Sequence, residues 1–247
     1  MSLITVAALL VAGIIAGFIN TLAGGGSLLT IPVLIFAGLP SPVANATNRV
    51  AIFMSCATAS GQFYHKKQLD IGEGIRTGIP GLFGAVAGAF LASVLGRQVF
   101  DKVLAVVLVL VLLTMFFKPR VATKENPKNV SAWLQIPAFF FIGVYGGFIQ
   151  AGVGFLLITA ITWVIGHDLV KTNALKMFIT LLFATLSLAI FAFYGKIVWS
   201  YGFVLGLGNV AGTWLGVHFA IKRGAEAIRW VVVAAVVASA LHLLGAF

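Results

Sequence analysis

The residues best suited to chemistry in this sequence are polar groups and glycines that interrupt long apolar stretches. The first set is NTLAGGGS, which runs from Asn20 to Ser27 and contains the consecutive glycines Gly24, Gly25 and Gly26. Glycines end helices readily, so we expect one helix to stop here and a short one to start at Ser27 with unpaired backbone N–H groups. The start of a helix carries partial positive charge, so this break can bind an anion without a side-chain cation.

A second break repeats this device later in the chain. The sequence QAGVGF begins at Gln150 and places Gly152 and Gly154 before another short apolar segment. Glycines of this kind also let helices pack closely, which is the alternative interpretation. Duplication in two corresponding short segments favours a binding site, because paired helix breaks form the substrate sites of many transporters.

An amide and a cation follow each break, at the start of a long apolar segment. In NATNRV, Arg49 follows Asn48 directly, and in KTNALKM, Lys176 lies on the same helical face as Asn173. A cation deep in a membrane costs about 2.5 to 3.5 kcal/mol on insertion scales and would favour a bound anion or a water-filled pore. The alternative is that both cations snorkel to the membrane surface. We expect all four side chains to add hydrogen-bond donors to the anion site.

Few other titratable groups fall within the apolar segments. All 6 Asp and Glu residues lie in loops or at segment ends, so we expect no buried carboxylate that binds Na⁺ or relays protons. His218 is the one candidate for proton coupling, although a hydrogen bond between packed helices is the simpler role. The sequence has no HExxH pair, no carboxylate dyad and no nucleophile beside a buried base, so we predict no catalytic residue, metal site or cofactor.

The elements that position these groups must lie in a lipid bilayer. Hydrophobic residues make up 61% of the 247 residues, charged residues only 9%, and the mean hydropathy is +1.10. A soluble domain could not bury so much apolar surface. The net charge of +10 could suggest nucleic acid, but Lys and Arg fall mostly in short loops between apolar runs, as membrane topology requires. We therefore expect an all-α polytopic membrane protein that binds no nucleic acid. Cys56 is the only cysteine, which excludes an intrachain disulfide.

The two halves of the chain resemble each other, since GFIN at 17–20 aligns with GFIQ at 147–150 and the later motifs follow in the same order. Apolar segments are expected at residues 2–19, 28–38, 44–64, 77–95 and 99–117, and again at 132–149, 155–165, 169–194, 197–220 and 228–244. The second segment of each half reaches only about 16 Å as a helix, roughly half of a bilayer core of about 30 Å. We predict two inverted five-segment repeats, residues 1–117 and 132–247, with about eight full transmembrane helices and two short or broken half-helices.

A polar linker, residues 118–131, joins the halves. If every segment crosses the membrane, most loop cations share the linker's side and only Arg97, Lys102 and Lys196 lie on the other. If the two short segments do not cross, this bias weakens. The positive-inside rule therefore favours inverted halves and a cytoplasmic linker.

The sequence GFINTLAGGGSLLTIPVL at 17–34, with ANATNR at 44–49 and NALK at 173–176, resembles the TauE/SafE family of sulfite and organosulfonate permeases. The likeness extends over essentially the whole chain. It implies a multi-pass permease of the prokaryotic cytoplasmic (inner) membrane for anions such as sulfite, sulfoacetate or thiosulfate. The thiosulfate-importing branch uses several cysteines at its constriction, so the single Cys56 argues against thiosulfate uptake by that route.

Together these observations predict a secondary transporter whose two breaks face each other near the membrane midplane and bind a small anion. Access would alternate as one half rocks against the other. A passive anion channel and a carrier of another oxyanion, such as thiosulfate or sulfate, are the alternatives. An intramembrane enzyme and a purely structural subunit fit the duplicated breaks less well. The expected partners are the anion and the lipid bilayer, and the sequence is compatible with a monomer or a homodimer.

Overall fold

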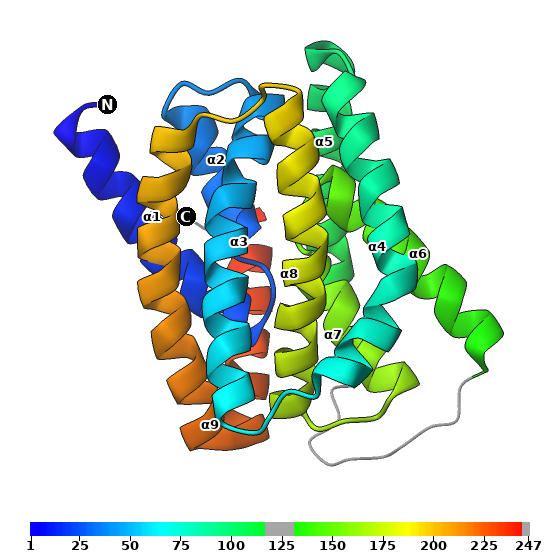
Figure 1. Cartoon of the computed structure of the whole chain (residues 1–247). Coiled ribbons are helices and arrows are strands. Elements are labelled where there is room, and N and C mark those ends of the chain that lie inside the picture. Colours follow the sequence, from blue (N-terminus) through cyan, green and yellow to red (C-terminus); the bar gives the residue numbers. More distant parts are fainter. Residues whose placement is uncertain (117–130, 244–247) are drawn as a thin grey trace.

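The computed structural model describes residues 1–116 and 131–243, which form helices joined by short loops and contain no strand within those ranges (Figure 1). The helices are α1 (Leu3–Leu22), α2 (Ser27–Phe36), α3 (Ser41–His65), α4 (Ile71–Val94), α5 (Arg97–Phe116), α6 (Ala132–Phe148), α7 (Val153–Val164), α8 (Leu169–Phe193) and α9 (Trp199–Leu243). The predicted linker, residues 118–131, lies outside the described residues except for Ser131, as does the predicted boundary at residue 117.

The predicted segments up to residue 194 each correspond to one helix. The fourth begins earlier than expected because Asp70 caps it, accepting a hydrogen bond from the Glu73 N–H at 3.0 Å. The last two predicted segments, 197–220 and 228–244, both lie in the 45-residue helix α9, with no loop between them. Figure 1 shows that α9 turns back after its orange part, so that its red end lies behind α3. The joining sequence IKRGAEA, residues 221–227, consists of good helix formers apart from Gly224, so the helix does not stop there.

Helix length and composition fit a membrane protein. Within the described residues, 4 helical stretches are long and apolar enough to cross a bilayer, namely α1, α4, α8 and Trp199–Arg223 of α9. As expected, α2 and α7 are short, with 10 and 12 residues. Helix α3 has 25 residues but is more polar, because it carries the NATNRV motif. The polar residues of this motif, Asn45, Thr47, Asn48 and Arg49, are each 0% exposed, so they do not face lipid.

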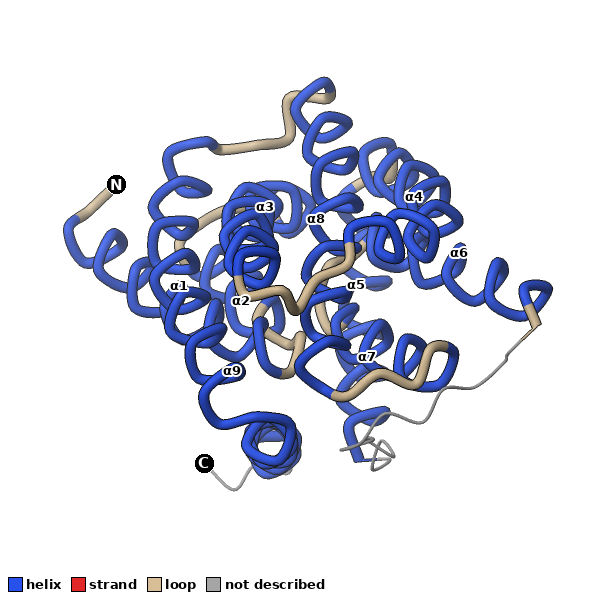
Figure 2. The backbone as a smooth tube through the Cα atoms, turned by 60° about the horizontal axis from the view of Figure 1, so that its bottom comes forward, coloured by secondary structure: helices blue, strands red, loops and turns tan. Residues whose placement is uncertain are grey.

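Two central helices organise the bundle. Helices α3 and α8 lie side by side and run in opposite directions (Figure 1). Helix α9 packs on both α3 and α1, whereas α4 packs on both α8 and α6 (Figure 2). Each flank therefore combines a helix from the first half of the chain with one from the second.

Glycines permit the close approach on both flanks. A Cβ on Gly212 of α9 would overlap the carbonyl of Ile14 in α1, and a Cβ on Gly88 of α4 would overlap the carbonyl of Val144 in α6. Small residues at such positions bring helix backbones together in membranes. These glycines fix the flanks rather than contribute chemistry.

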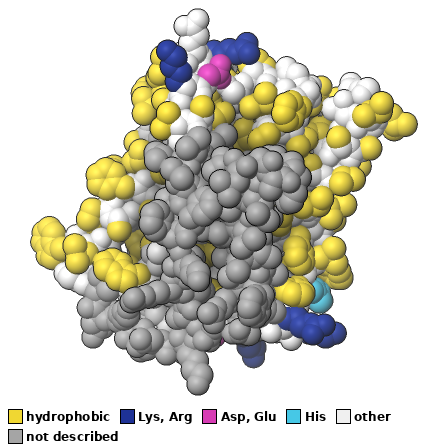
Figure 3. All heavy atoms as spheres, turned by 180° about the vertical axis from the view of Figure 1, so that it is seen from behind, with side chains coloured by type: hydrophobic (Ala, Val, Ile, Leu, Met, Phe, Trp, Pro, Cys, Tyr) yellow, Lys and Arg dark blue, Asp and Glu magenta, His cyan; other side chains and the backbone are white. Residues whose placement is uncertain are grey.

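The outer surface is suited to lipid. On the described part of the face in Figure 3, hydrophobic side chains predominate between the two ends, and Lys and Arg gather at the upper and lower ends. Large apolar side chains such as Phe83 and Phe193 are 69% and 86% exposed. A water-soluble protein rarely exposes apolar surface on this scale. The chain is therefore an integral, multi-pass membrane protein.

Candidate functional site

The two glycine breaks touch each other. One lies between α1 and α2, and the other lies between α6 and α7. A Cβ on Gly24 would overlap the Cα of Gly154, and a Cβ on Gly25 would lie 2.7 Å from the ring of Phe155. Gly24 has φ +90° and Gly152 has φ +76°, conformations that only glycine adopts without strain. The expectation that the breaks face each other therefore agrees with the structure.

Side chains of α3 cap the end of α6. Arg49 donates from Nη1 to the carbonyl of Gly146 at 2.6 Å and from Nη2 to that of Gly147 at 2.8 Å. Asn45 Nδ2 donates to the carbonyl of Phe148 at 2.9 Å. The last carbonyls of a helix have no partners within it and carry partial negative charge. A cation and an amide from α3 thus provide hydrogen-bond donors for the last carbonyls of a helix that ends at the glycine break.

Further groups hold the Arg49 guanidinium in place. Gln150, at the start of the second break, accepts a hydrogen bond from Nη1. The ring of Phe191 in α8 lies 5.5 Å from the central guanidinium carbon, within range of a cation–π interaction. Arg49 is 0% exposed, so it does not snorkel to the membrane surface.

Lys176 of α8 caps α1 as Arg49 caps α6. Its Nζ donates to the carbonyls of Asn20 and Thr21 and to Oδ1 of Asn173, each at 2.8 Å. These bonds use all three N–H donors of the ammonium group. Lys176 is 1% exposed, so snorkelling is excluded here too. Each half of the chain therefore supplies the cation that caps the broken helix of the other half.

The start of α2 is tied to α3 by an amide. Asn48 Nδ2 donates to Oγ of Ser27 at 3.0 Å, and Oδ1 of Asn48 accepts from the Thr30 hydroxyl at 2.7 Å. The N–H groups of Gly25, Gly26 and Ser27 have no backbone acceptor within residues 1–116 and 131–243. This end of α2 thus offers N–H donors that are held in a fixed position.

Among the candidate site residues, two buried side-chain donors also lack partners within the described part of the chain. They are Nε of Arg49 and Nδ2 of Asn173, and both residues are 0% exposed. Buried donors are rarely left unpaired, so such a pair requires an explanation. Asn20 contributes its carbonyl to the Lys176 cap and is itself buried beside these groups.

Sequence reasoning missed two residues of this cluster. Asn45 caps α6, and Thr30 holds the amide that fixes α2. Both residues could have been suspected from spacing, because Asn45 precedes Arg49 by one helical turn and Thr30 follows Ser27 by a little less than one turn. Their hydrogen-bond partners could not have been predicted, since these depend on how the helices pack.

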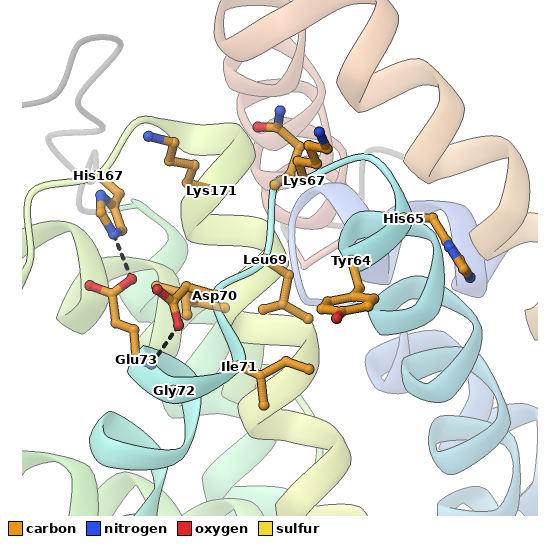
Figure 4. Close-up of a pocket in the computed structure, with 12 residues that line it drawn as sticks. Tyr64, His65, Lys67, Leu69, Asp70, Ile71, Gly72, Glu73, His167 and Lys171 are labelled. Atoms are coloured by element: carbon orange, nitrogen blue, oxygen red, sulfur yellow. Dashed lines mark hydrogen bonds and ion pairs between the residues drawn. The ribbon is translucent and has the colours of Figure 1, made fainter.

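A cavity of about 880 Å³ opens at the end of the molecule where α3 leads into α4 and α7 into α8 (Figure 4). We call it the vestibule. Lys67 and Lys171 lie on its rim, and His167 Nε2 lies 2.8 Å from Glu73 Oε2, joining the α7–α8 loop to α4. Leu175, which also lines the vestibule, directly precedes Lys176. The vestibule is therefore lined by the sequence neighbour of a site cation, although Lys176 itself does not line it.

His218 lies apart from this cluster. It is exposed on α9, with its ring centroid 4.4 Å from that of Trp214. It lines a second cavity with Lys66 and Lys222 rather than joining the glycine breaks. The position of His218, away from the glycine breaks, therefore does not support a role in proton coupling.

The described acidic groups are all peripheral. Asp168 caps α8 by accepting from the N–H groups of Val170 and Lys171 at 2.8 and 3.0 Å, and Asp101 accepts from the Ser41 hydroxyl. Within the described ranges, no three His, Cys, Asp or Glu residues are grouped as a metal site would require. The buried cations therefore have helix carbonyls as partners and no carboxylate among these residues.

Comparison with known proteins agrees with a membrane protein. A family model described as sulfite exporter TauE/SafE matches residues 9–243. A probable membrane transporter protein, ORF9, of a Sinorhizobium species is 28% identical over 237 residues, which is 96% of this chain and 91% of the relative. A probable membrane transporter protein of Haemophilus influenzae is 29% identical over 222 residues, or 90% of this chain and 87% of the relative.

A third relative is the probable membrane transporter protein YfcA of Escherichia coli K12. It is 26% identical over 220 residues, which is 89% of this chain and 82% of the relative. No solved structure matches the chain.

Proposed function

This chain belongs to the sulfite exporter TauE/SafE family of membrane transporters, and we propose that it carries small sulfur-containing anions such as sulfite or organosulfonates. The site would lie where the two glycine breaks meet. The relatives are named as membrane transporters, which supports transport rather than enzymatic catalysis.

The observation that carries this proposal is a buried, electropositive centre with unused donors. Arg49 and Lys176 place two cations there, and the carbonyls that cap them only partly offset their charge. The unpaired Arg49 Nε and Asn173 Nδ2 and the free N–H groups at the start of α2 are all donors. An oxyanion supplies charge and several acceptor oxygens at once, so it complements this set better than a neutral or cationic solute.

Alternating access is the proposed mechanism. The opposite directions of α3 and α8 and the mutual capping of the broken helices support two inverted halves, residues 1–117 and 132–247, that share one central site (Figure 1). In that arrangement the linker at 118–131 is cytoplasmic and the protein resides in the prokaryotic inner membrane. Rocking one half against the other would move the caps and the breaks together.

The vestibule would be the way in from one side. Its lining carries Lys67 and Lys171, which attract anions, whereas the two carboxylates there, Asp70 and Glu73, have partners in the Glu73 N–H and His167. Leu175, which lines it, and Lys176 are each 1% exposed, so Lys176 is closed off in this state. A closed centre behind this vestibule favours a carrier over a continuous channel.

The test is uptake of labelled sulfite or taurine into proteoliposomes by wild type, Asn173→Leu and Ser187→Ala. Asn173→Leu removes an unpaired buried donor at the site and, with it, the Oδ1 acceptor of Lys176. Ser187→Ala is the matched control, because Ser187 is also buried on α8 with an unpaired hydroxyl but lies further along the helix. We expect Asn173→Leu to lose most uptake, with a melting temperature still high enough for assay, and Ser187→Ala to keep it. Equal uptake by all three proteins would remove the proposed site.

Trans-acceleration distinguishes a carrier from a channel. Unlabelled sulfite inside the liposomes should speed uptake of labelled sulfite if the site alternates between the two sides. Single-channel currents without such acceleration would select the channel alternative.

A further inference from the structure

We propose that the second cavity, between α3 and α9, binds the phosphate headgroup of an anionic phospholipid. This lateral pocket has a volume of about 260 Å³ and is lined by Gln62, His65, Lys66, Trp214, His218 and Lys222, among others. None of these residues belongs to the site at the glycine breaks.

The pocket is basic on both of its walls. Helix α3 and the residue after it provide His65 and Lys66, and α9 provides His218 and Lys222. No Asp or Glu is among the described side chains that line it. Nothing described in the pocket therefore neutralises the two lysines, and a phosphate would be the natural counter-charge.

An unpaired amide points to a ligand independently of the charge. Gln62 Nε2 is buried and has no hydrogen-bond partner within the described residues, although Gln62 lines the pocket. A buried amide donor without a partner is uncommon. A phosphate oxygen held between the lysines would accept a hydrogen bond from it.

The position of the pocket favours a lipid over free phosphate. Trp214 lines it and is 50% exposed, and the neighbouring Leu215 is 48% exposed, so this side of α9 faces hydrocarbon. Tryptophan is enriched at the depth of lipid headgroups. Histidine and Lys or Arg side chains gather at one lower edge of the molecule, directly beneath hydrophobic side chains (Figure 3). Basic pockets between transmembrane helices at this depth bind anionic headgroups.

The experiment is native mass spectrometry of the full-length protein titrated with phosphatidylglycerol or phosphatidylcholine. Wild type should retain phosphatidylglycerol in preference to phosphatidylcholine. Lys66→Gln combined with Lys222→Gln should weaken phosphatidylglycerol binding about 30-fold, since each lysine near a membrane surface contributes roughly a factor of five. Phosphatidylcholine binding should not change.

The matched control is Lys102→Gln combined with Lys196→Gln, which removes the same charge near the opposite end of the bundle. It should bind phosphatidylglycerol as wild type does. Equal binding by the pocket variant and wild type, or equal loss in the control, would overturn the proposal. Gel filtration checks that both variants are folded.

A thermal-shift comparison separates lipid from free phosphate. Phosphatidylglycerol should raise the melting temperature of wild type, and inorganic phosphate at millimolar concentration should not. Equal stabilisation by inorganic phosphate that the pocket variant abolishes would refute the lipid assignment, because the ligand would then be the free anion.

Discussion

Replacing Gly24 by alanine tests whether the two helix breaks are in contact. The new Cβ would overlap the Cα of Gly154, a backbone atom that cannot rotate away. Gly38 offers a matched control in the same half of the chain. It also has a left-handed conformation, with φ +97° against +90° for Gly24, but a Cβ there has no neighbour within 4 Å.

The two variants share the cost of a strained backbone conformation and differ in the cost of steric overlap. An L side chain in the left-handed region costs about 1 to 2 kcal/mol, and both variants carry that cost. Overpacking against backbone adds about 1 to 3 kcal/mol, and only Gly24→Ala carries this second cost. A chain of this size loses roughly 2 to 4 °C in melting temperature per kcal/mol. Gly24→Ala should therefore melt about 2 to 12 °C below Gly38→Ala.

Thermal unfolding in detergent, followed by intrinsic tryptophan fluorescence, measures this difference. Uptake of labelled sulfite into proteoliposomes should then be lost in Gly24→Ala and kept in Gly38→Ala. If both variants melt at the same temperature, the breaks do not touch and the site has no centre. If Gly24→Ala melts lower but transports normally, the breaks serve packing alone.

Three further predictions concern the groups around the breaks. Arg49→Lys replaces a planar fork with a single ammonium, so one carbonyl of α6 should lose its partner at a cost of about 1 to 3 kcal/mol, seen as a lower melting temperature. Asn48→Leu leaves two hydroxyls of α2 without their amide partner, and we expect a similar loss of stability. Sulfite should also raise the melting temperature of this variant less than that of wild type. Lys67→Gln should raise the KM for uptake severalfold at low salt, whereas Lys102→Gln should not, and the difference should shrink above about 0.15 M ionic strength. An unchanged KM for Lys67→Gln would mean that the vestibule is not the route of the anion.

The helical segments and their breaks were readable from local sequence. Apolar runs of given length predict spans, and glycines predict where helices stop, because both effects act within a few residues. The short helices α2 and α7 were found for this reason. The last two segments are joined within helix α9 without a loop, because residues 221–227 favour a helix although their charges suggested a loop.

Only part of the candidate site could be predicted from the sequence. The sequence identified Arg49 and Lys176 as candidate site cations but left open that both reach the membrane surface, and repetition identified the two breaks as related. It gave no indication that each cation would cap the broken helix of the other half, nor that a vestibule would stop beside Lys176. Both cations were expected to donate directly to the anion, and the structure shows most of their donors bound to carbonyls.

By itself, then, the sequence determined that this chain is a helical membrane protein with duplicated glycine breaks and cations near the starts of apolar segments, since residue type and spacing suffice for those statements. Only the tertiary structure decided which groups meet. Arg49 and its acceptor Gly146 are 97 residues apart, and Lys176 and Asn20 are 156 apart. Contacts over such separations depend on how the helices cross and pack, which no local pattern specifies.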